Sequence, residues 1–181
     1  MTCTVYIATS LDGYIAGPDD DIEWLELVPN PDNSDLGFFA FIENIDALIM
    51  GRSTYETVMG FGMGWHYPVP GIVLSTTLTE LPETADEPTT QPVTLFNGSP
   101  GEALAHAKQM GFEHLYVDGG KTIQGFLQDD LIDELIIAEI PVLLGAGAPL
   151  FGSLPEMLEF ELLGSEVLLD QIVKKHYRRK R

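Results

Sequence analysis

Two glycine-containing segments hold two of the three basic residues in the first 173 positions of this acidic chain. Arg52 lies in residues 50–56 (MGRSTYE), Lys121 lies in residues 118–123 (DGGKTI), and the third, Lys108, lies on an amphipathic helical stretch. Each of the two segments follows an apolar run typical of a β-strand and precedes a helical stretch. A strand followed by a glycine turn and a helix N-terminus offers free backbone N–H groups and the positive end of a helix dipole. Together the turns predict a site for two phosphate groups of one dinucleotide.

The composition limits the function classes. A chain of 181 residues is expected to form one domain, and 45% apolar with 20% charged residues is ordinary for a globular protein. The net charge of -19 repels polyanions, so general binding to nucleic acid or to an anionic membrane is not expected. We therefore expect the partner to be a small-molecule substrate.

The basic charge is concentrated at the C-terminus. All 28 acidic residues lie at or before Asp170, whereas six of the nine basic residues lie in residues 174–181 (KKHYRRKR). This tail could contact nucleic acid or an acidic partner. Alternatively, it is a last strand whose charges pair with the acidic body, or a frayed, solubilising end. We favour the second interpretation because six basic residues do not outweigh 28 acids.

Cysteine and histidine usage argues against disulfides and metal sites. Cys3 is the only cysteine, which excludes an intramolecular disulfide and a cysteine-based zinc site. His66, His106 and His114 show no metal-ligand spacing. Residues 1–8 lack the pattern of a signal peptide, and no apolar run approaches the ~18 residues of a membrane span. We expect a protein of the reducing cytoplasm with no bound metal.

Strand-like and helical segments alternate along the chain, which predicts an α/β fold in a single domain over residues 1–181. Strands are expected at residues 4–9, 47–50, 71–75, 93–96, 114–117, 135–140, 158–169 and 172–177. Helices are expected at residues 22–27, after Ser34 with Leu36, Phe39 and Ile42 buried, from the Arg52 turn through Met59, from a capping box at Ser99 and Glu102 to Gly111, and at residues 122–128. Residues 60–68 and the proline-rich residues 81–92 are expected to be loops.

The order of these elements and their glycine turns resembles the dihydrofolate reductase superfamily over nearly the whole chain. Residues 7–17 (IATSLDGYIAG) resemble its first strand and the loop after it, residues 50–56 its dinucleotide turn, and residues 118–120 its diglycine turn. Within the superfamily, residues 140–151 (IPVLLGAGAPLF) resemble the reductase domain of riboflavin biosynthesis. That domain also occurs in a bifunctional deaminase–reductase, but the zinc-deaminase signature is absent here, so the chain resembles the reductase module alone.

The resemblance implies a three-layer fold of the dihydrofolate reductase type. Its central sheet would be mixed but mostly parallel, flanked by helices, and would end in a C-terminal antiparallel hairpin. The implied activity resembles that of a 5-amino-6-(5-phosphoribosylamino)uracil reductase. It is hydride transfer from NADPH, with NADH not excluded, to a small pyrimidine or pteridine-like heterocycle. Because reductase modules of the riboflavin type are usually homodimers, a homodimer is implied as well.

The resemblance also assigns cofactor-binding roles to particular residues. The backbone of Ala8 and Ile15 would hold the nicotinamide carboxamide, and Arg52 would contact the 2′-phosphate of the adenosine. Gly119 and Gly120 would let the backbone approach the pyrophosphate closely. The other residues implied in cofactor binding are Gly51, Ser53, Thr54, Ser75, Lys121, Thr122 and Ile123.

Alternatives stay open for the basic residues of this site. Arg52 could instead form a surface salt bridge with Glu56 at helical spacing, although we favour the cofactor role because basic residues are scarce. Lys121 could be a solvated lysine at a helix start. Many relatives carry an Arg directly after the Ser of the third strand, but Thr76 follows Ser75 here, so a preference for NADPH depends almost entirely on Arg52.

The proton donor is the least determined part of the site. Asp35 resembles the substrate-binding carboxylate of dihydrofolate reductase, or it complements a helix dipole behind Ser34. Residues 137–140 (IAEI) lack the Thr that works with that carboxylate in dihydrofolate reductase. Three function classes remain: a riboflavin-type reductase, a dihydrofolate reductase, and a non-catalytic dinucleotide-binding module.

Overall fold

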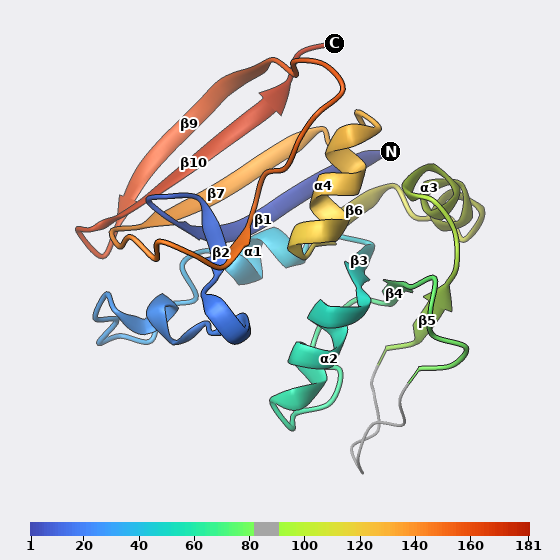
Figure 1. The fold of residues 1–181 in the computed structure, drawn as a ribbon, viewed down its shortest axis with the longest axis horizontal. Helices are drawn as coiled ribbons and strands as arrows, with labels where there is room; N and C mark the ends of the chain where they lie inside the picture. Colours follow the sequence, from blue (N-terminus) through green and yellow to red (C-terminus); the bar gives the residue numbers. More distant parts are fainter. Residues whose placement is uncertain (82–90) are drawn as a thin grey trace.

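A computed structural model describes residues 1–81 and 91–181, and its centre is an eight-stranded sheet with the strand order β5-β4-β3-β6-β1-β7-β10-β9 (Figure 1). The strands are β1 Thr2–Ser10, β3 Ala47–Gly51, β4 Gly71–Leu74, β5 Val93–Phe96, β6 His114–Asp118, β7 Glu134–Ile140, β9 Phe160–Leu168 and β10 Ile172–Arg179. Every pairing from β5 to β7 is parallel, whereas β10 is antiparallel to both β7 and β9. The expected mixed, mostly parallel sheet with a C-terminal antiparallel hairpin is confirmed.

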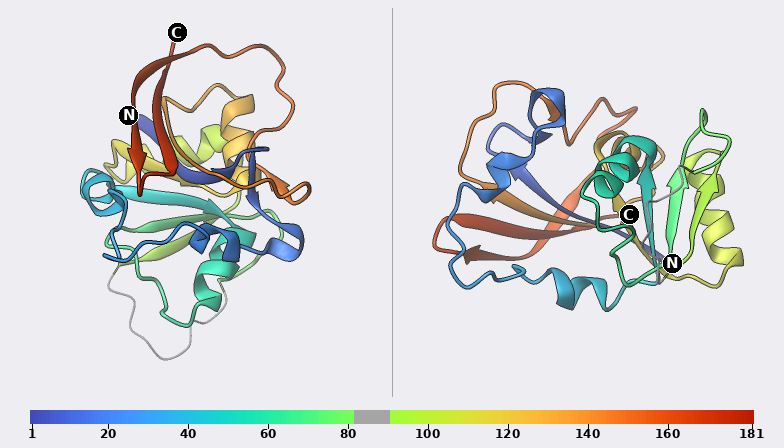
Figure 2. Two further views of the ribbon diagram at one scale, coloured as in Figure 1. Left: turned by 90° about the vertical axis from the view of Figure 1, so that its left-hand side faces the viewer. Right: turned by 90° about the horizontal axis from the view of Figure 1, so that it is seen from below.

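Helices cover both faces of the sheet and make three layers. The helices are α1 Phe38–Ile42, α2 Arg52–Gly60, α3 Pro100–Gln109 and α4 Gly120–Gln128. Tyr55 of α2 packs against Leu48 on one face, and Phe126 of α4 packs against Ile49 on the other. Successive residues of a strand point to opposite faces, which explains why neighbouring β3 residues serve two different cores. Figure 2 shows α2 and α4 on opposite sides of the sheet.

A second, two-stranded sheet joins distant parts of the chain. It pairs β2 (Tyr14–Ala16) with β8 (Ala148–Pro149) in antiparallel register. Two short 3-10 helices, Pro18–Asp20 and Glu23–Glu26, follow β2. The small sheet therefore holds the loop after β1 against the segment after β7.

The basic C-terminal segment pairs with acids of the same chain. It forms most of β10, which lies inside the sheet between β7 and β9. Its Lys and Arg ion pairs within the described residues are Lys174–Glu166 (2.8 Å), Lys175–Glu139 (3.2 Å), Arg178–Glu134 (3.1 Å), Arg179–Asp130 (2.7 Å), Lys180–Glu159 (3.9 Å), Arg181–Asp130 (3.6 Å) and Arg181–Asp133 (2.5 Å). This geometry agrees with the interpretation of the tail as a strand that pairs with the acidic body.

The helix expected after Ser34 is wrong in its start and in one buried residue. Leu36 (φ 55°) and Gly37 (φ 91°) adopt left-handed backbone conformations, so a continuous helix cannot run from Ser34. The observed α1 begins only at Phe38. Phe39 is 66% exposed rather than buried, whereas Ile42 is buried as expected.

The start of α3 was predicted correctly from its capping residues. The capping box at α3 is confirmed, because Ser99 accepts the Glu102 N–H (3.3 Å) and Glu102 accepts the Ser99 N–H (2.8 Å). The C-terminal strand expected from residue 158 begins later, at Phe160.

Most of the expected loop at residues 81–92 lies outside the described residues. Within the described chain, no helix combines the length and apolar content that a membrane crossing needs.

Candidate functional site: two glycine turns at one edge of the sheet

The two glycine turns meet because β3 and β6 are parallel neighbours. Met50 and Asp118 pair across these strands, so the turns after them leave the same edge of the sheet. A Cβ on Gly51 would lie 2.7 Å from the Thr122 hydroxyl of α4, and a Cβ on Gly119 would overlap the Thr54 hydroxyl of α2. Each glycine thus makes room for a side chain from the opposite helix start, which locks the two turns together.

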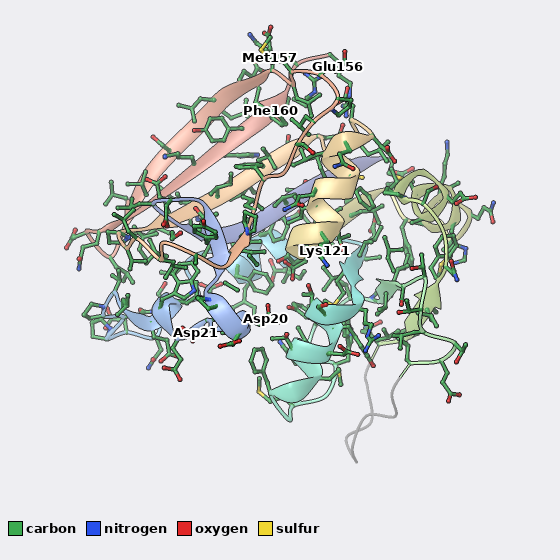
Figure 3. The ribbon with its side chains drawn as sticks, in the orientation of Figure 1. Asp20, Asp21, Lys121, Glu156, Met157 and Phe160 are labelled. Atoms are coloured by element: carbon green, nitrogen blue, oxygen red, sulfur yellow. The ribbon has the colours of Figure 1, made fainter. Side chains whose placement is uncertain are left out.

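The start of each helix presents uncapped backbone N–H groups. Helix α2 begins after Gly51 and α4 after Gly119, and neither N-cap residue makes a side-chain hydrogen bond. Gly119 has φ 90°, a conformation that favours glycine. Two adjacent helix N-termini without caps form a cradle suited to a pyrophosphate. Lys121 is exposed in the first turn of α4 (Figure 3).

The Arg52 side chain, at the start of α2, reaches the turn after β4 that contains Ser75. The Arg52 guanidinium contacts Glu56 (2.7 Å) and lies 3.4 Å from the Thr77 hydroxyl. The buried Ser75 hydroxyl accepts the backbone N–H groups of Thr77 (3.2 Å) and Leu78 (3.0 Å). The Glu56 salt bridge is therefore present, and Arg52 also reaches the turn expected near the adenosine ribose.

The residues expected at the nicotinamide end lie on the other side of α4. Ala8 of β1 pairs with Ala138 of β7. Ile15 of β2 touches the diglycine turn, because a Cβ on Gly120 would lie 3.1 Å from its Cδ1 atom. The structure thus brings the Ile15 strand and the diglycine turn together, and their roles in cofactor binding stay predictions.

Asp12 fixes the loop between Ala8 and Ile15, a role that the sequence alone did not indicate. Its carboxylate accepts hydrogen bonds from the Ser10 hydroxyl (2.6 Å), the Leu144 N–H (3.1 Å) and the Gly145 N–H (2.7 Å). The Ser10 hydroxyl and these backbone groups lower the pKa of Asp12. Asp12 therefore connects residues 7–17 to residues 140–151, which the sequence analysis treated as two separate motifs.

An acid at the end of β6 is the most chemically distinctive group of the site. Asp118 directly precedes the diglycine turn, and its carboxylate accepts the Gly119 N–H (2.8 Å). Burial raises the pKa of Asp118 to about 6, although the bonds from Gly119 and Tyr116 act in the opposite direction. A carboxyl group with this pKa can hold or release a proton near neutral pH. The sequence analysis quoted Asp118 only as part of the turn.

Aromatic side chains lie on the same face of the sheet as this acid. Thr4 pairs with Tyr116, so Tyr6 and Asp118, each two residues further along, share that face. The half-buried rings of Phe38 and Tyr67 lie 6.3 Å apart, and Phe38 lies 5.8 Å from Tyr6. The charge of Asp118 adds to burial in raising the pKa of Tyr67, which agrees with their proximity.

Asp35 lies at the start of α1, and its carboxylate is occupied by the backbone. It accepts hydrogen bonds from the N–H groups of Phe39 (2.6 Å) and Gly37 (3.2 Å), and these bonds lower its pKa. The side chain is exposed. This geometry matches the helix-dipole alternative, and a catalytic role for Asp35 stays a prediction.

One buried donor near the nicotinamide end lacks a partner. Among the described residues, the Trp24 Nε1–H is the one buried side-chain polar atom without a hydrogen bond. Trp24 packs in a cluster with Ile140 and Ile172, and the half-buried Ala8 borders this cluster. An unpaired buried donor costs roughly 1–3 kcal/mol. The feature of the chain that fits a dinucleotide is the pair of uncapped helix starts at the glycine turns.

The chain matches the RibD C-terminal domain family over residues 2–174. It belongs to this family. YwjB, an uncharacterized Bacillus subtilis protein, is 34% identical over 174 residues, which cover 96% of this chain and 95% of the relative. A crystal structure described as a putative riboflavin biosynthesis protein from Shewanella sp. PV-4 is 47% identical, with a TM-score of 0.93 and full coverage of both chains.

More distant structures share the fold. A Thermotoga maritima deaminase/5-amino-6-(5-phosphoribosylamino)uracil reductase superimposes with a TM-score of 0.72 at 17% identity. The match covers 99% of this RibD-family chain but only 56% of that longer protein. Dihydrofolate reductase from Enterococcus faecalis superimposes with a TM-score of 0.67 at 20% identity and covers 99% and 97% of the two chains. The expected dihydrofolate reductase-like fold is confirmed.

Proposed function

We propose that this protein is a nicotinamide-dependent reductase that transfers a hydride to a small pyrimidine or pteridine-like heterocycle. The observation that carries the proposal is the edge shared by β3 and β6, where two uncapped helix starts adjoin an acid with a pKa of about 6. Family membership supports the proposal, and the dihydrofolate reductase with a similar fold was solved with NADP(H). We place the protein in the cytoplasm, in keeping with such a metabolic role.

The residues of the chain bind and orient the cofactor, which supplies the hydride. The backbone N–H groups that follow Gly51 and Gly119 would hold the pyrophosphate, and the backbone around Ala8 and Ile15 would hold the carboxamide. Asp12 would keep the Ile15 strand in place through its bonds to residues 144 and 145. A rigid cofactor site of this kind raises the rate by holding the reacting groups in position.

Asp118 would supply the proton that accompanies hydride transfer. Reduction of a C=N bond needs an acid near the accepting nitrogen, directly or through one water. With a pKa of about 6, the carboxyl group keeps an appreciable protonated fraction near neutral pH. The aromatic rings around it would exclude bulk water from the acceptor.

Arg52 would favour NADPH over NADH. Its guanidinium already reaches the Thr77 hydroxyl beside the buried Ser75, so a 2′-phosphate at this turn would compete with Glu56 for it. A charge-assisted contact to phosphate contributes roughly 1.5–3 kcal/mol. Thr76, exposed at the same turn, adds no charge.

Thermal denaturation with NADPH, NADH and folate analogues tests the proposal. Because a ligand that binds only the native state raises its stability, NADPH should raise the melting temperature most, and folate analogues should raise it little. A larger shift with folate analogues than with uncharged pyrimidines would favour the dihydrofolate reductase alternative. The absence of a shift with either nucleotide would contradict the proposal.

We also propose a homodimer formed through the C-terminal hairpin. Strand β9 is the edge strand of the sheet, and its side chains Leu162, Leu163 and Val167 are exposed. Met157, just before β9, is 79% exposed and projects from the molecule (Figure 3). An apolar edge of this kind needs a cover. Light scattering across a salt series should give the mass of a dimer. The dimer should dissociate more readily at low salt, because two protomers of net charge -19 repel each other.

A further inference from the structure

The positions and partners of the nine basic residues bear on the charge of the substrate that the site can bind. Arg52 and Lys121 lie at the glycine turns assigned to the cofactor, and Lys108 lies in the last turn of α3. The other six are those of the C-terminal segment, and each forms an ion pair with an acid of the same chain. Each of the nine basic residues thus lies at a turn assigned to the cofactor, on α3, or in an ion pair of the C-terminal segment.

Lys174 is the one cation close to those rings, and it is already engaged. Its Nζ atom lies 2.8 Å from the Glu166 carboxylate and donates to the Leu36 carbonyl at 2.9 Å. The same atom lies 5.8 Å from the centre of the Tyr6 ring. These contacts tie Lys174 to the chain just before α1, and its side chain is only 15% exposed, against 47% for the ion-paired Arg52.

Backbone groups on the substrate side are also occupied. The N–H groups at the start of α1 donate to the Asp35 carboxylate, so they offer nothing to an anion. The loop that follows β2 carries three exposed acids in succession, Asp19, Asp20 and Asp21, of which Asp20 and Asp21 are labelled in Figure 3. Each of these carboxylates would repel a phosphate group near the site.

The surroundings of Asp118 instead suit a flat, uncharged ring. Tyr6, Phe38 and Tyr67 present half-buried aromatic surfaces, and aromatic pairs contribute through stacked or edge-on contacts. The protonated Asp118 carboxyl can donate to a ring nitrogen, whereas its ionised form would repel an anion. Shape and charge therefore point to the same class of ligand.

We infer that the substrate of this site is an uncharged planar heterocycle without a phosphate group. This inference rests on the proposed function, because it concerns the hydride acceptor of the same site. It separates this chain from the reductase of Thermotoga maritima, whose name specifies a phosphoribosyl compound.

A matched pair of ligands tests the inference. The probes are 5-amino-6-(5-phosphoribosylamino)uracil and the same compound without its phosphate, measured by tyrosine and tryptophan fluorescence on the protein saturated with NADP⁺. We expect the unphosphorylated compound to bind with equal or higher affinity. Tighter binding of the phosphorylated compound by tenfold or more would overturn the inference. So would the failure of every unphosphorylated pyrimidine and pteridine tested to bind at millimolar concentration.

Two variants identify the groups responsible. Phe38→Ala should weaken binding of the unphosphorylated ring by roughly threefold to tenfold, because an aromatic contact is lost. Lys174→Met should leave the affinity ratio of the matched pair unchanged, and a selective loss of the phosphorylated ligand in this variant would overturn the inference by making Lys174 a phosphate site. If the unphosphorylated heterocycles bind normally but NADPH is never oxidised in their presence, the proposed function is contradicted. The inferred class of ligand is not.

Discussion

Replacing Asp118 with Asn should stabilise the protein at neutral and alkaline pH. The substitution keeps an oxygen that can accept the Gly119 N–H at 2.8 Å but removes the ionisable group. Burial raises the pKa of this carboxyl from 3.8 to about 6, so the folded protein binds its proton more tightly than the unfolded chain does. Ionised Asp118 is therefore a cost to the fold, which Asn does not carry.

The size and pH range of this effect follow from the pKa shift. Below about pH 4 the carboxyl is protonated in both states and costs nothing, and between about pH 4 and pH 6 stability falls as pH rises. Above about pH 6 the full penalty applies, which corresponds to about 3 kcal/mol for a shift from 3.8 to about 6. The variant should therefore exceed the wild type by up to about 3 kcal/mol at pH 8 and match it at pH 3.5.

Urea denaturation at pH 8 and at pH 3.5 measures the difference directly through the free energy of unfolding. Asp170→Asn is a suitable control, because Asp170 is exposed in the turn between β9 and β10 and its left-handed conformation (φ 59°) also suits Asn. The control should change stability by less than about 0.5 kcal/mol at either pH. If Asp118→Asn is no more stable than the wild type at pH 8, the raised pKa and the catalytic argument built on it are both wrong.

The cofactor residues give three further predictions. Arg52→Ala should weaken NADPH binding about tenfold and leave NADH nearly unchanged, and calorimetric titration that shows equal losses for both would remove the 2′-phosphate role. Gly120→Val should abolish nucleotide binding in a protein with native circular dichroism, because a side chain there meets Ile15 and obstructs the phosphate, so unimpaired binding would exclude the diglycine turn. Asp12→Ala should raise the KM for NADPH several-fold while Asp12→Asn is milder, and equal kinetics for the wild type and Asp12→Ala would contradict the anchoring role.

The parts of the fold that the sequence predicted are those set by local chemistry. The capping box of α3 needs only Ser99 and Glu102 three residues apart, and both of its hydrogen bonds are present. The two glycine turns follow strands and start helices, so their anion-binding groups could be anticipated without knowing the neighbouring strands. Their assignment to one dinucleotide site was a hypothesis, and the sheet order now places β3 beside β6 so that the two turns meet at one edge.

The features that the sequence did not predict depend on residues that are distant in the chain or on an unusual backbone conformation. The raised pKa of Asp118 arises from its burial beside Tyr67 and Tyr116, and Tyr67 belongs to a loop without periodicity. The anchoring by Asp12 requires residues 144 and 145, more than a hundred positions away. The failed helix start at Ser34 reflects the left-handed backbone at Leu36, which no apolar spacing reveals.

The basic C-terminal segment shows that the number of basic residues alone does not locate a phosphate-binding site. The protein has a net charge of -19, and its basic C-terminal segment forms ion pairs with acids of the same chain, in agreement with the favoured interpretation of the tail. Pairs at the surface add little stability, ~0–1 kcal/mol each, whereas the Arg179 side chain, which pairs with Asp130, is only 11% exposed. In the proposed site, phosphate binding would depend on the backbone N–H groups at two helix starts and on Arg52. The chain would then have one phosphate-binding region, which would hold the cofactor and leave none for a phosphorylated substrate.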